Sequence, residues 1–562
     1  INLIEKYGIT YAQSNMLYYE WMEQHEPGLF LKIKHLIKSG KWEVVGGSWV
    51  EFDANMPLGE SLIRQFVIGK EYAREKFGVN VSIAWLPDTF GFSVSLPKIL
   101  GAVGIRYFLT SKLHWNDTTR FPHYIFTWES DDGSKILSYL TVSSYDAPFD
   151  QKLVEEAISK MLERHGISSV LYLYGRGDHG GGPSEGEAKA VVECIENQRK
   201  TIMVSKATDF FSELEQRISR GLSIPAVRGE LYLQFHRGVY TVQPKIKRLI
   251  RLLETGLIFL EFLLVLARVF NVRCALKNSI REYWKTLLTN QFHDIMAGTL
   301  SKDATVEVLA ELRKCYKHLR GEIDIVAREI VKKIASSRDK GRALVVINNL
   351  PWRRDVTVRM SNGGIIRVSD VPGFGYKIIR LGDARLGCGV VLGEDSQNII
   401  LENKYYRVFI SKKYGLIMQI LDKKSGNKLL SGPIRIRIYS DEPNYKRRNF
   451  AGAYAYIFDA WEVFIHDNKA KPIELLVPER VSIIEKSPLR VIIEAEYRYR
   501  EKRSIDSTFC LRYVLEEASD YLDIEIIVDW KARHRMAKLA IPLNVSSDTA
   551  MYGAPYGKIE RI

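Results

Sequence analysis

The chain has 562 residues and a net charge of +14, with 46 % hydrophobic and 26 % charged residues. That length exceeds what a single hydrophobic core supports and predicts roughly two to four domains. The composition is typical of globular proteins and excludes a disordered or fibrous chain. Because Lys and Arg are spread along the whole length among acidic residues, we expect no nucleic-acid partner despite the positive charge.

The five cysteines lie far apart, and none forms a Cys-x-x-Cys pair. This pattern argues against a disulfide framework and against a cysteine-based zinc site. We recognise no secretory signal. The apolar run 256–267 contains Glu261 and is shorter than the ~18 residues of a membrane span, so it predicts a core helix. We therefore expect a cytoplasmic protein without membrane contact; the oligomeric state stays open, a homo-oligomer included.

Residues 1–230 alternate between helical and strand-like patterns, which predicts an α/β domain. Apolar residues recur at helical spacing in 60–78, and short apolar or β-branched runs bounded by turns predict strands. These runs are 81–86, 105–111, 134–142 and 168–175. Such alternation is typical of βα units around a mainly parallel sheet or barrel.

Residues 231–336 hold almost no strand signal and predict a three-helix bundle. Its helices are expected at 244–270, at 281–296 and from 301 onward. From 343 to 562, short alternating strands separated by Gly, Asn, Asp and Pro predict a β-sandwich domain. The charged stretch 337–342 is the predicted linker, so the fold class is multidomain α/β + α + β.

Asp88 stands where the apolar part of "SIAWLPDTFGFSVSLPKIL" (82–100) ends, and aromatic residues follow it. One interpretation is a cap of the following helix, because Asp is a favoured N-cap residue. The other is a catalytic group, because α/β folds present such groups at the C-terminal ends of strands. This stretch alone leaves both interpretations open.

Glycines in "LYLYGRGDHGGGP" (171–183) formally match the G-x-G-x-x-G fingerprint of dinucleotide sites. That interpretation is disfavoured, because Asp178 would repel a pyrophosphate and Pro183 places the helix start too late. Asp178 itself follows the predicted strand, among glycines that let a ligand approach the backbone. Together with Asp88 it suggests glycoside hydrolysis, in which one carboxylate attacks and the other protonates the leaving oxygen.

His293 and Asp294 lie toward the predicted end of the second helix, in "LLTNQFHDIMAGT" (287–299). A histidine there usually packs or caps. Here the polar residues 290–294 interrupt an apolar helix, which indicates that this end faces something other than core. Asp and His are suitable zinc ligands, although two of them make only half a site.

Six blocks follow one another along the chain: "VVGGSWVEFDANMPLGESLIRQ", "AWLPDTFGFSVSLPKIL", "FLTSKLHWNDTTRFPHYIFTWESDDGSKIL", "LYGRGDHGGGP", "RGELYLQFHRGVYT" and "TNQFHDIMAGT". In this order they resemble the α-mannosidases of glycoside hydrolase family 38, in the branch with cytosolic and microbial members. "DAWEVF" and "DWKARHRMAKLAIPL" resemble that family's C-terminal part. The likeness covers nearly the whole chain.

The resemblance implies a retaining exo-α-mannosidase that holds one zinc, or another divalent metal, in a barrel-like (β/α) domain. In the family's D-x-F-G block the aspartate is both nucleophile and zinc ligand, which corresponds here to Asp88. The histidine of the Q-F-H-D block is a zinc ligand, here His293, and the adjacent Asp294 is expected to contact sugar hydroxyls.

Further roles follow from the same resemblance. Phe90 would lie beside the sugar ring, and Lys112 occupies the position of the family's basic residue near the nucleophile. Asp178 is the candidate acid/base. Apart from the resemblance, Trp49, Trp85, Trp115 and Trp128 could line a sugar site by stacking, and core packing is the expected role of at least half of them.

One departure limits these implications. The family's first zinc-binding block, an H-x-D, has no match here, so we expect the first strand and the last sandwich strands of relatives to be missing and this chain to be inactive or weakly active. The alternative is a non-catalytic carbohydrate-binding remnant. A metal-dependent deacetylase on a related barrel is disfavoured, because the histidines are scattered singly.

Overall fold

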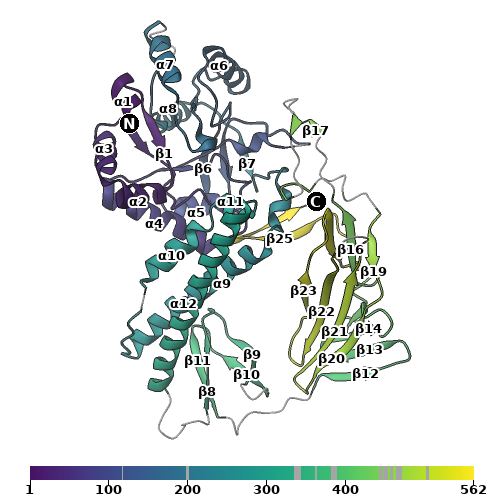
Figure 1. Cartoon of the computed structure of the whole chain (residues 1–562). Coiled ribbons are helices and arrows are strands. Elements are labelled where there is room, and N and C mark those ends of the chain that lie inside the picture. The colour runs from purple at the N-terminus through teal and green to yellow at the C-terminus, as the bar shows by residue number, and fades with distance from the viewer. Residues whose placement is uncertain are drawn as a thin grey trace.

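The computed structural model describes residues 1–562 except 117, 198–201, 277, 335–342, 361–363, 381–388, 442–446, 449–453, 456–459, 464–470, 502–504 and 562. The predicted linker 337–342 and Cys388 lie outside the described residues. Figure 1 shows an N-terminal α/β region, a helical region in the middle and a long β region that runs beside both. Within the described residues, no helix is both long and apolar enough to cross a membrane.

Short parallel strands with helices around them build the α/β region. Its helices are α1 (Asn2–Tyr7), α2 (Met16–His25), α3 (Pro27–Lys38), α4 (Gly59–Phe77), α5 (Leu96–Ala102), α6 (Gln151–His165), α7 (Glu185–Asn197) and α8 (Ala207–Ser219). Its strands are β1 (Tyr11–Gln13), β2 (Trp42–Val44), β3 (Ile83–Trp85), β4 (Tyr107–Thr110), β5 (Ile125–Glu129), β6 (Lys135–Leu140) and β7 (Ala226–Arg228).

These strands form two adjoining open sheets. β1 and β2 pair in parallel, and the five-stranded sheet has the order β3-β4-β6-β5-β7, with β5 antiparallel to β6. The Gly46 N–H donates to the Ile83 carbonyl oxygen at 3.0 Å, which ties the end of β2 to β3. The carboxyl ends of β1, β2, β3 and β4 therefore meet at one edge, where α/β folds present functional groups.

One strand of the sequence prediction is wrong. Residues 168–174 form no strand, and Asp178 lies in the short 3-10 turn η2 (Gly177–His179). The apolar run at 170–173 packs half-buried against a core cluster instead of entering the sheet. An apolar run of this length does not by itself distinguish a strand from a packed loop.

Three long helices pack together in the middle of the chain, as predicted: α9 (Pro244–Val269), α10 (Ile280–Thr289) and α12 (Lys302–Ile334). The predicted core helix 256–267 lies inside α9, where Leu257, Leu260 and Leu263 are fully buried. The prediction of one helix over 281–296 is wrong, because α10 ends at Thr289 and a short helix, α11 (His293–Ala297), follows.

Glu254 joins the helical region to the α/β region. This fully buried carboxylate of α9 accepts from the Leu58 N–H at 2.7 Å, from the Ser61 hydroxyl at 2.7 Å and from the Gln291 amide at 2.9 Å. Arg251 lies 2.9 Å from its second oxygen. These contacts offset part of the cost of burying the carboxylate, and burial still raises its pKa overall.

Replacing Glu254 by Ala should lower the free energy of unfolding by about 3 kcal/mol, because it leaves buried donors without an acceptor. Thermal and urea unfolding of the variant check this. Glu329→Ala, which removes an exposed pair with Lys332 on α12, is the control and should cost under about 1 kcal/mol. Equal effects of the two substitutions would contradict the assigned role.

The β region follows. Its strands are β8 (Ala343–Asn348), β9 (Arg354–Arg359), β10 (Ile365–Val371), β11 (Gly375–Arg380), β12 (Val391–Glu394), β13 (Asn398–Glu402), β14 (Tyr406–Ser411), β15 (Ile417–Asp422), β16 (Arg435–Ser440), β17 (Arg447–Arg448), β18 (Tyr454–Ala455), β19 (Ile473–Leu475), β20 (Arg480–Lys486), β21 (Arg490–Tyr499), β22 (Ser507–Glu516), β23 (Asp523–Asp529), β24 (Arg535–Ala540), β25 (Ala550–Ala554) and β26 (Gly557–Arg561).

A sandwich makes up most of this region. The sheets β12-β13-β14-β15, β20-β21-β22-β23 and β19-β16-β24 enclose one apolar core. Two antiparallel pairs, β8 with β11 and β9 with β10, form separate sheets near the ends of α9 and α12 (Figure 1), and β9 contacts the sandwich through the Thr357 hydroxyl, which donates to Glu516 at 2.7 Å. Phe374 and Tyr376 of the first pair contact Phe262 and Phe270 of the α9 segment.

The hairpin β25–β26 reaches back from the sandwich to the α/β region (Figure 1). Arg561 forms a bidentate pair with Glu230, at 2.8 and 2.5 Å, and the Tyr556 hydroxyl donates to Glu60 at 2.9 Å. The β region thus contacts the α/β region directly and not only through the helices.

Candidate active site

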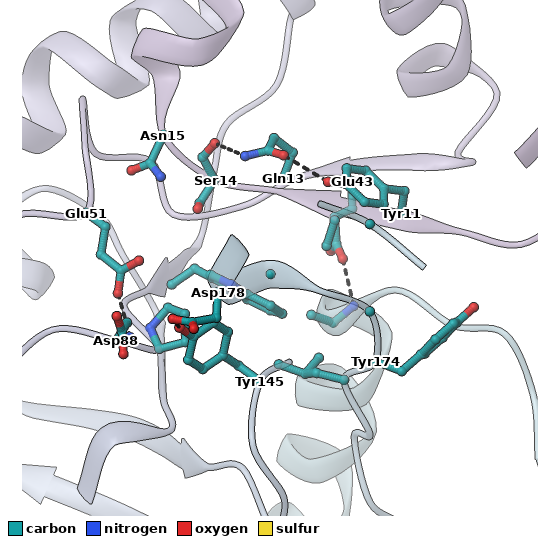
Figure 2. A pocket seen from close by; sticks show the side chains of 18 of the residues that line it. Tyr11, Gln13, Ser14, Asn15, Glu43, Glu51, Asp88, Tyr145, Tyr174 and Asp178 are labelled. Carbon is teal, nitrogen blue, oxygen red and sulfur yellow. Dashed lines mark hydrogen bonds between the residues drawn. The ribbon is translucent and has the colours of Figure 1, made fainter. Parts of the chain in front are cut away.

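A cavity of about 440 Å³ lies at the carboxyl edge of the parallel strands. Ends of β1, β2 and β3, the loop 171–183 and the start of α11 line it. Figure 2 shows carboxylates from separate segments, among them Glu51, Asp88 and Asp178, gathered at one end of this cavity. Polar groups from several segments that converge on one concave site mark it as the candidate functional site.

Asp88 follows β3 directly after Pro87, and its side chain is one-fifth exposed. The Lys112 ammonium, just past β4, donates a hydrogen bond to Oδ1, and His293 Nε2 lies 3.3 Å from Oδ2. The alternative that Asp88 caps a helix is wrong, because α5 begins at Leu96 with Ser95 at its N-cap. The strand end instead delivers a carboxylate into the cavity.

His293 is buried at the first position of α11, not near the end of a longer helix as predicted. Its N–H and its Nδ1 contact the Glu51 carbonyl oxygen at 3.1 and 2.8 Å. An Nδ1–H that donates to this oxygen turns Nε2 toward Asp88. Metal-binding histidines are commonly oriented in this way, by a hydrogen bond from the ring nitrogen that does not bind the metal. Because α10 ends at Thr289, the chain can turn before α11 and bring His293 to the cavity.

Glu51 links Asp88 to His293, and the sequence prediction missed it. Its Oε1 accepts from the Asp88 N–H at 2.7 Å and from the Thr89 N–H at 3.1 Å, while its carbonyl oxygen accepts from His293. In the sequence, the sign that pointed to Glu51 was its position as a charged residue in the mostly apolar stretch 44–52. The bridge between Phe52 and Phe292 then holds these two segments side by side.

The ionisation of these groups is coupled. Burial alone would raise the pKa of Asp88, but the hydrogen bond from His293 and the charge of Lys112 lower it overall. Burial would lower the pKa of His293, and the contact with Asp88 together with the charges of Glu51 and Asp294 raises it to about 9. Burial raises the pKa of Glu51 to about 7. Asp88 is consequently ionised at neutral pH.

Asp178 lies in the same cavity although its predicted strand does not exist. It accepts a hydrogen bond from the Tyr145 hydroxyl at 2.9 Å. Burial raises the pKa of Tyr145, and the charges of Asp88 and Asp178 raise it further, so this phenol lies within the field of both carboxylates. Tyr145 carried no sequence signal that separated it from an ordinary tyrosine.

The remaining predicted site residues lie around Asp88. The Phe90 ring is buried, 5.2 Å from the His293 ring, and Lys112 Nζ lies 5.3 Å from it. Asp294 is 3.9 Å from His293 Nε2 and lines the cavity. Of the four tryptophans, Trp49 and Trp128 are core residues, Trp85 lines the cavity and Trp115 is half exposed beside Lys112.

Asp88 and His293 are suitable ligand types for a zinc ion, but they are fewer than a zinc site needs. A carboxylate oxygen of Asp88 and an imidazole nitrogen of His293 face each other, which is the chemistry of a zinc site. Among the described residues, no group of three or more His, Cys, Asp or Glu side chains could hold an ion. Catalytic zinc sites use three protein ligands, so the described residues supply a partial set.

Comparison with known proteins places the whole chain in one family. The family models "Glycosyl hydrolases family 38 N-terminal domain", "Alpha mannosidase middle domain" and "Glycosyl hydrolases family 38 C-terminal domain" match residues 1–231, 234–330 and 401–562.

Three relatives illustrate the likeness. An alpha-mannosidase of Saccharomyces cerevisiae is 29 % identical over 98 % of the chain and 49 % of its own length, and human alpha-mannosidase 2C1 is 28 % identical over 98 % and 52 %. An Enterococcus faecalis alpha-mannosidase structure shares the fold with a TM-score of 0.79 at 15 % identity, covering all of this chain and 73 % of its own. The chain thus spans about half the length of these curated relatives, and it belongs to glycosyl hydrolase family 38.

Proposed function

We propose that the chain is the part of a retaining exo-α-mannosidase that carries the catalytic carboxylates and hydrolyses terminal α-linked mannose. The observation that supports this most is the convergence of Asp88, Lys112 and His293 at the cavity that also receives Asp178. Glycoside hydrolysis uses two carboxylates beside one cavity, one as nucleophile and one as acid/base.

In this mechanism Asp88 attacks the anomeric carbon, and the lowered pKa of its carboxyl suits that role. Lys112 and His293 hold the carboxylate in place from two sides. Asp178 is the acid/base: it protonates the leaving oxygen and then takes a proton from the water that releases mannose. Phe90 lies beside the sugar ring, and Asp294 accepts hydrogen bonds from sugar hydroxyls.

We also propose that Asp88 and His293 bind zinc or another divalent cation. Such an ion would supply Lewis-acid polarisation of sugar hydroxyls and a positive charge beside the nucleophile. Cys194, Cys274, Cys315 and Cys510 are free, which supports the expected cytoplasmic location.

Hydrolysis of 4-nitrophenyl α-mannoside, followed by NMR of the first sugar released, tests the proposed function. We expect α-mannose as the first product, because a double displacement retains configuration. Absence of turnover with and without zinc, from this chain and from the chain extended to the length of its relatives, would contradict the proposal. First release of β-mannose would contradict its stereochemical part.

Zinc binding makes a separate prediction. After equilibration with zinc and gel filtration, we expect His293→Ala to retain at least about tenfold less metal than the unchanged chain, because it loses the only nitrogen ligand proposed. His318→Ala, on the exposed face of α12, is the control and should retain the original content. Metal analysis by mass spectrometry gives the readout, and equal retention by all three proteins would rule out His293 as a ligand.

A further inference from the structure

A segment of the β region, residues 460–462, docks against residues 236–238, which precede α9 and lie next to the candidate site. The Gly238 N–H donates to the Trp461 carbonyl oxygen at 2.9 Å. The Glu462 carboxylate accepts from the His236 N–H at 2.7 Å and contacts His236 Nδ1 at 2.8 Å. These partners lie more than two hundred residues apart in the sequence, so the tertiary fold alone brings them together.

Two features of residues 236–238 allow residues 460–462 to approach closely. A Cβ on Gly238 would lie 2.9 Å from the Trp461 carbonyl carbon, so only glycine allows this approach without displacement. His236 has φ of 68°, a conformation that costs energy for a non-glycine residue and persists only when its surroundings hold it. Both His236 and Glu462 are over nine-tenths buried, so their pairing is shielded from water.

From the docked segment an unbroken run of contacts leads to the nucleophile. The His236 ring lies 4.7 Å from the Trp461 ring and 4.8 Å from the Phe90 ring, and Trp461 lies 5.6 Å from Phe90. On its other side Phe90 contacts the His293 ring at 5.2 Å and the Lys112 ammonium at 5.3 Å. Those last two residues are the ones that hold Asp88.

We propose that residues 460–462 position Phe90 in the mannoside site. Glu462 holds His236 in place, and His236 and Trp461 together set the position of the Phe90 ring. This rests on the proposed function, in which Phe90 lies beside the sugar ring. His236, Trp461 and Glu462 are positioning residues, because they act through Phe90. If Phe90, His236 and Trp461 are already held rigidly, less conformational entropy is lost when sugar binds. Substitutions that loosen these three rings should therefore weaken sugar binding.

Two substitutions loosen this docking by different routes. Glu462→Gln keeps the size of the side chain but removes its charge and offers one acceptor oxygen to His236 where the carboxylate offers two. Gly238→Ala keeps His236 and Glu462 and pushes the segment outward. Tyr556→Phe is the matched control: it removes another hydrogen bond of the β region, to Glu60 on α4, and leaves His236, Trp461 and Glu462 unchanged.

The first measurement is steady-state kinetics on 4-nitrophenyl α-mannoside with the chain extended to the length of its relatives. We expect Glu462→Gln and Gly238→Ala to raise KM about five- to tenfold, and Tyr556→Phe to leave it unchanged. A smaller folded fraction would lower kcat and leave KM unchanged. An unchanged KM in both variants would therefore mean that residues 460–462 only stabilise the fold, and it would overturn the proposal.

The second measurement needs no activity. Hydrogen exchange of the amides of residues 88–92 should become at least about threefold faster in Glu462→Gln and Gly238→Ala and stay the same in Tyr556→Phe. Faster exchange confined to 236–240 and 460–462 would overturn the coupling to Phe90. If no protein turns over substrate but exchange at 88–92 responds, the proposed function fails while the coupling stands.

Discussion

Asp88→Asn should lower kcat/KM for 4-nitrophenyl α-mannoside by at least about 10⁴-fold, with the protein still folded. The amide cannot attack the anomeric carbon, whereas it keeps the size of the carboxylate and can still accept from Lys112. Kinetics on the substituted and unchanged proteins, with a thermal unfolding curve for each, measure the effect. Asp150→Asn is the control, because Asp150 caps α6 on the surface and asparagine caps equally well.

This experiment also separates the enzyme from a carbohydrate-binding remnant. A remnant would bind mannose in the unchanged protein without turnover, and Asp88→Asn would leave that binding as it was. Asp178→Asn adds a second criterion: with a good leaving group such as 2,4-dinitrophenol it should lose far less activity than Asp88→Asn, since that leaving group needs no proton. Equal loss in the two variants would contradict the assigned acid/base.

Glu51→Ala should lower kcat/KM by about 10²-fold, although Glu51 is not itself assigned a chemical step. The substitution leaves the Asp88 and Thr89 N–H groups buried without an acceptor, at about 1–3 kcal/mol each. The backbone that carries the nucleophile would shift to recover those hydrogen bonds. The same kinetic assay, together with the unfolding midpoint, measures both consequences.

Glu51→Gln separates hydrogen bonding from charge. The glutamine oxygen can accept both N–H groups, so this variant should stay within about tenfold of the unchanged kcat/KM. Burial raises the pKa of Glu51 to about 7, so near neutral pH much of the unchanged protein already carries an uncharged side chain there. If the glutamine variant were as damaged as the alanine variant, the negative charge and not the geometry would be what Glu51 contributes.

The site draws on all three regions of the chain. Strand ends of the α/β region carry Asp88 and Lys112, and the helical region supplies His293 through the turn after α10. In the β region, Trp461 packs against Phe90, and Glu254 ties α9 to Gln291, two residues before His293. Changes far from the cavity, at Glu254 or Glu462, should therefore affect the site as well as the stability of the fold.

The sequence by itself determined the local features. The strand patterns located β3, β4 and β6 but not β1, β2, β5 or β7, and helical spacing located α4, α9 and α12. Apolar periodicity reports burial over a few turns of chain, which is why these elements could be predicted. It failed at 168–174 and between α10 and α11, where the local pattern suits more than one conformation and packing decides between them.

Only the tertiary structure decided which distant groups meet. His293 is oriented by the carbonyl oxygen of Glu51, and every residue has such an oxygen, so no side-chain pattern could have pointed to it. The contact of Glu462 with His236 likewise depends on how the β region packs against the segment that precedes α9. Because local preferences act over a few residues while these contacts span hundreds, their geometry follows from the packing of whole regions and not from any single stretch of the chain.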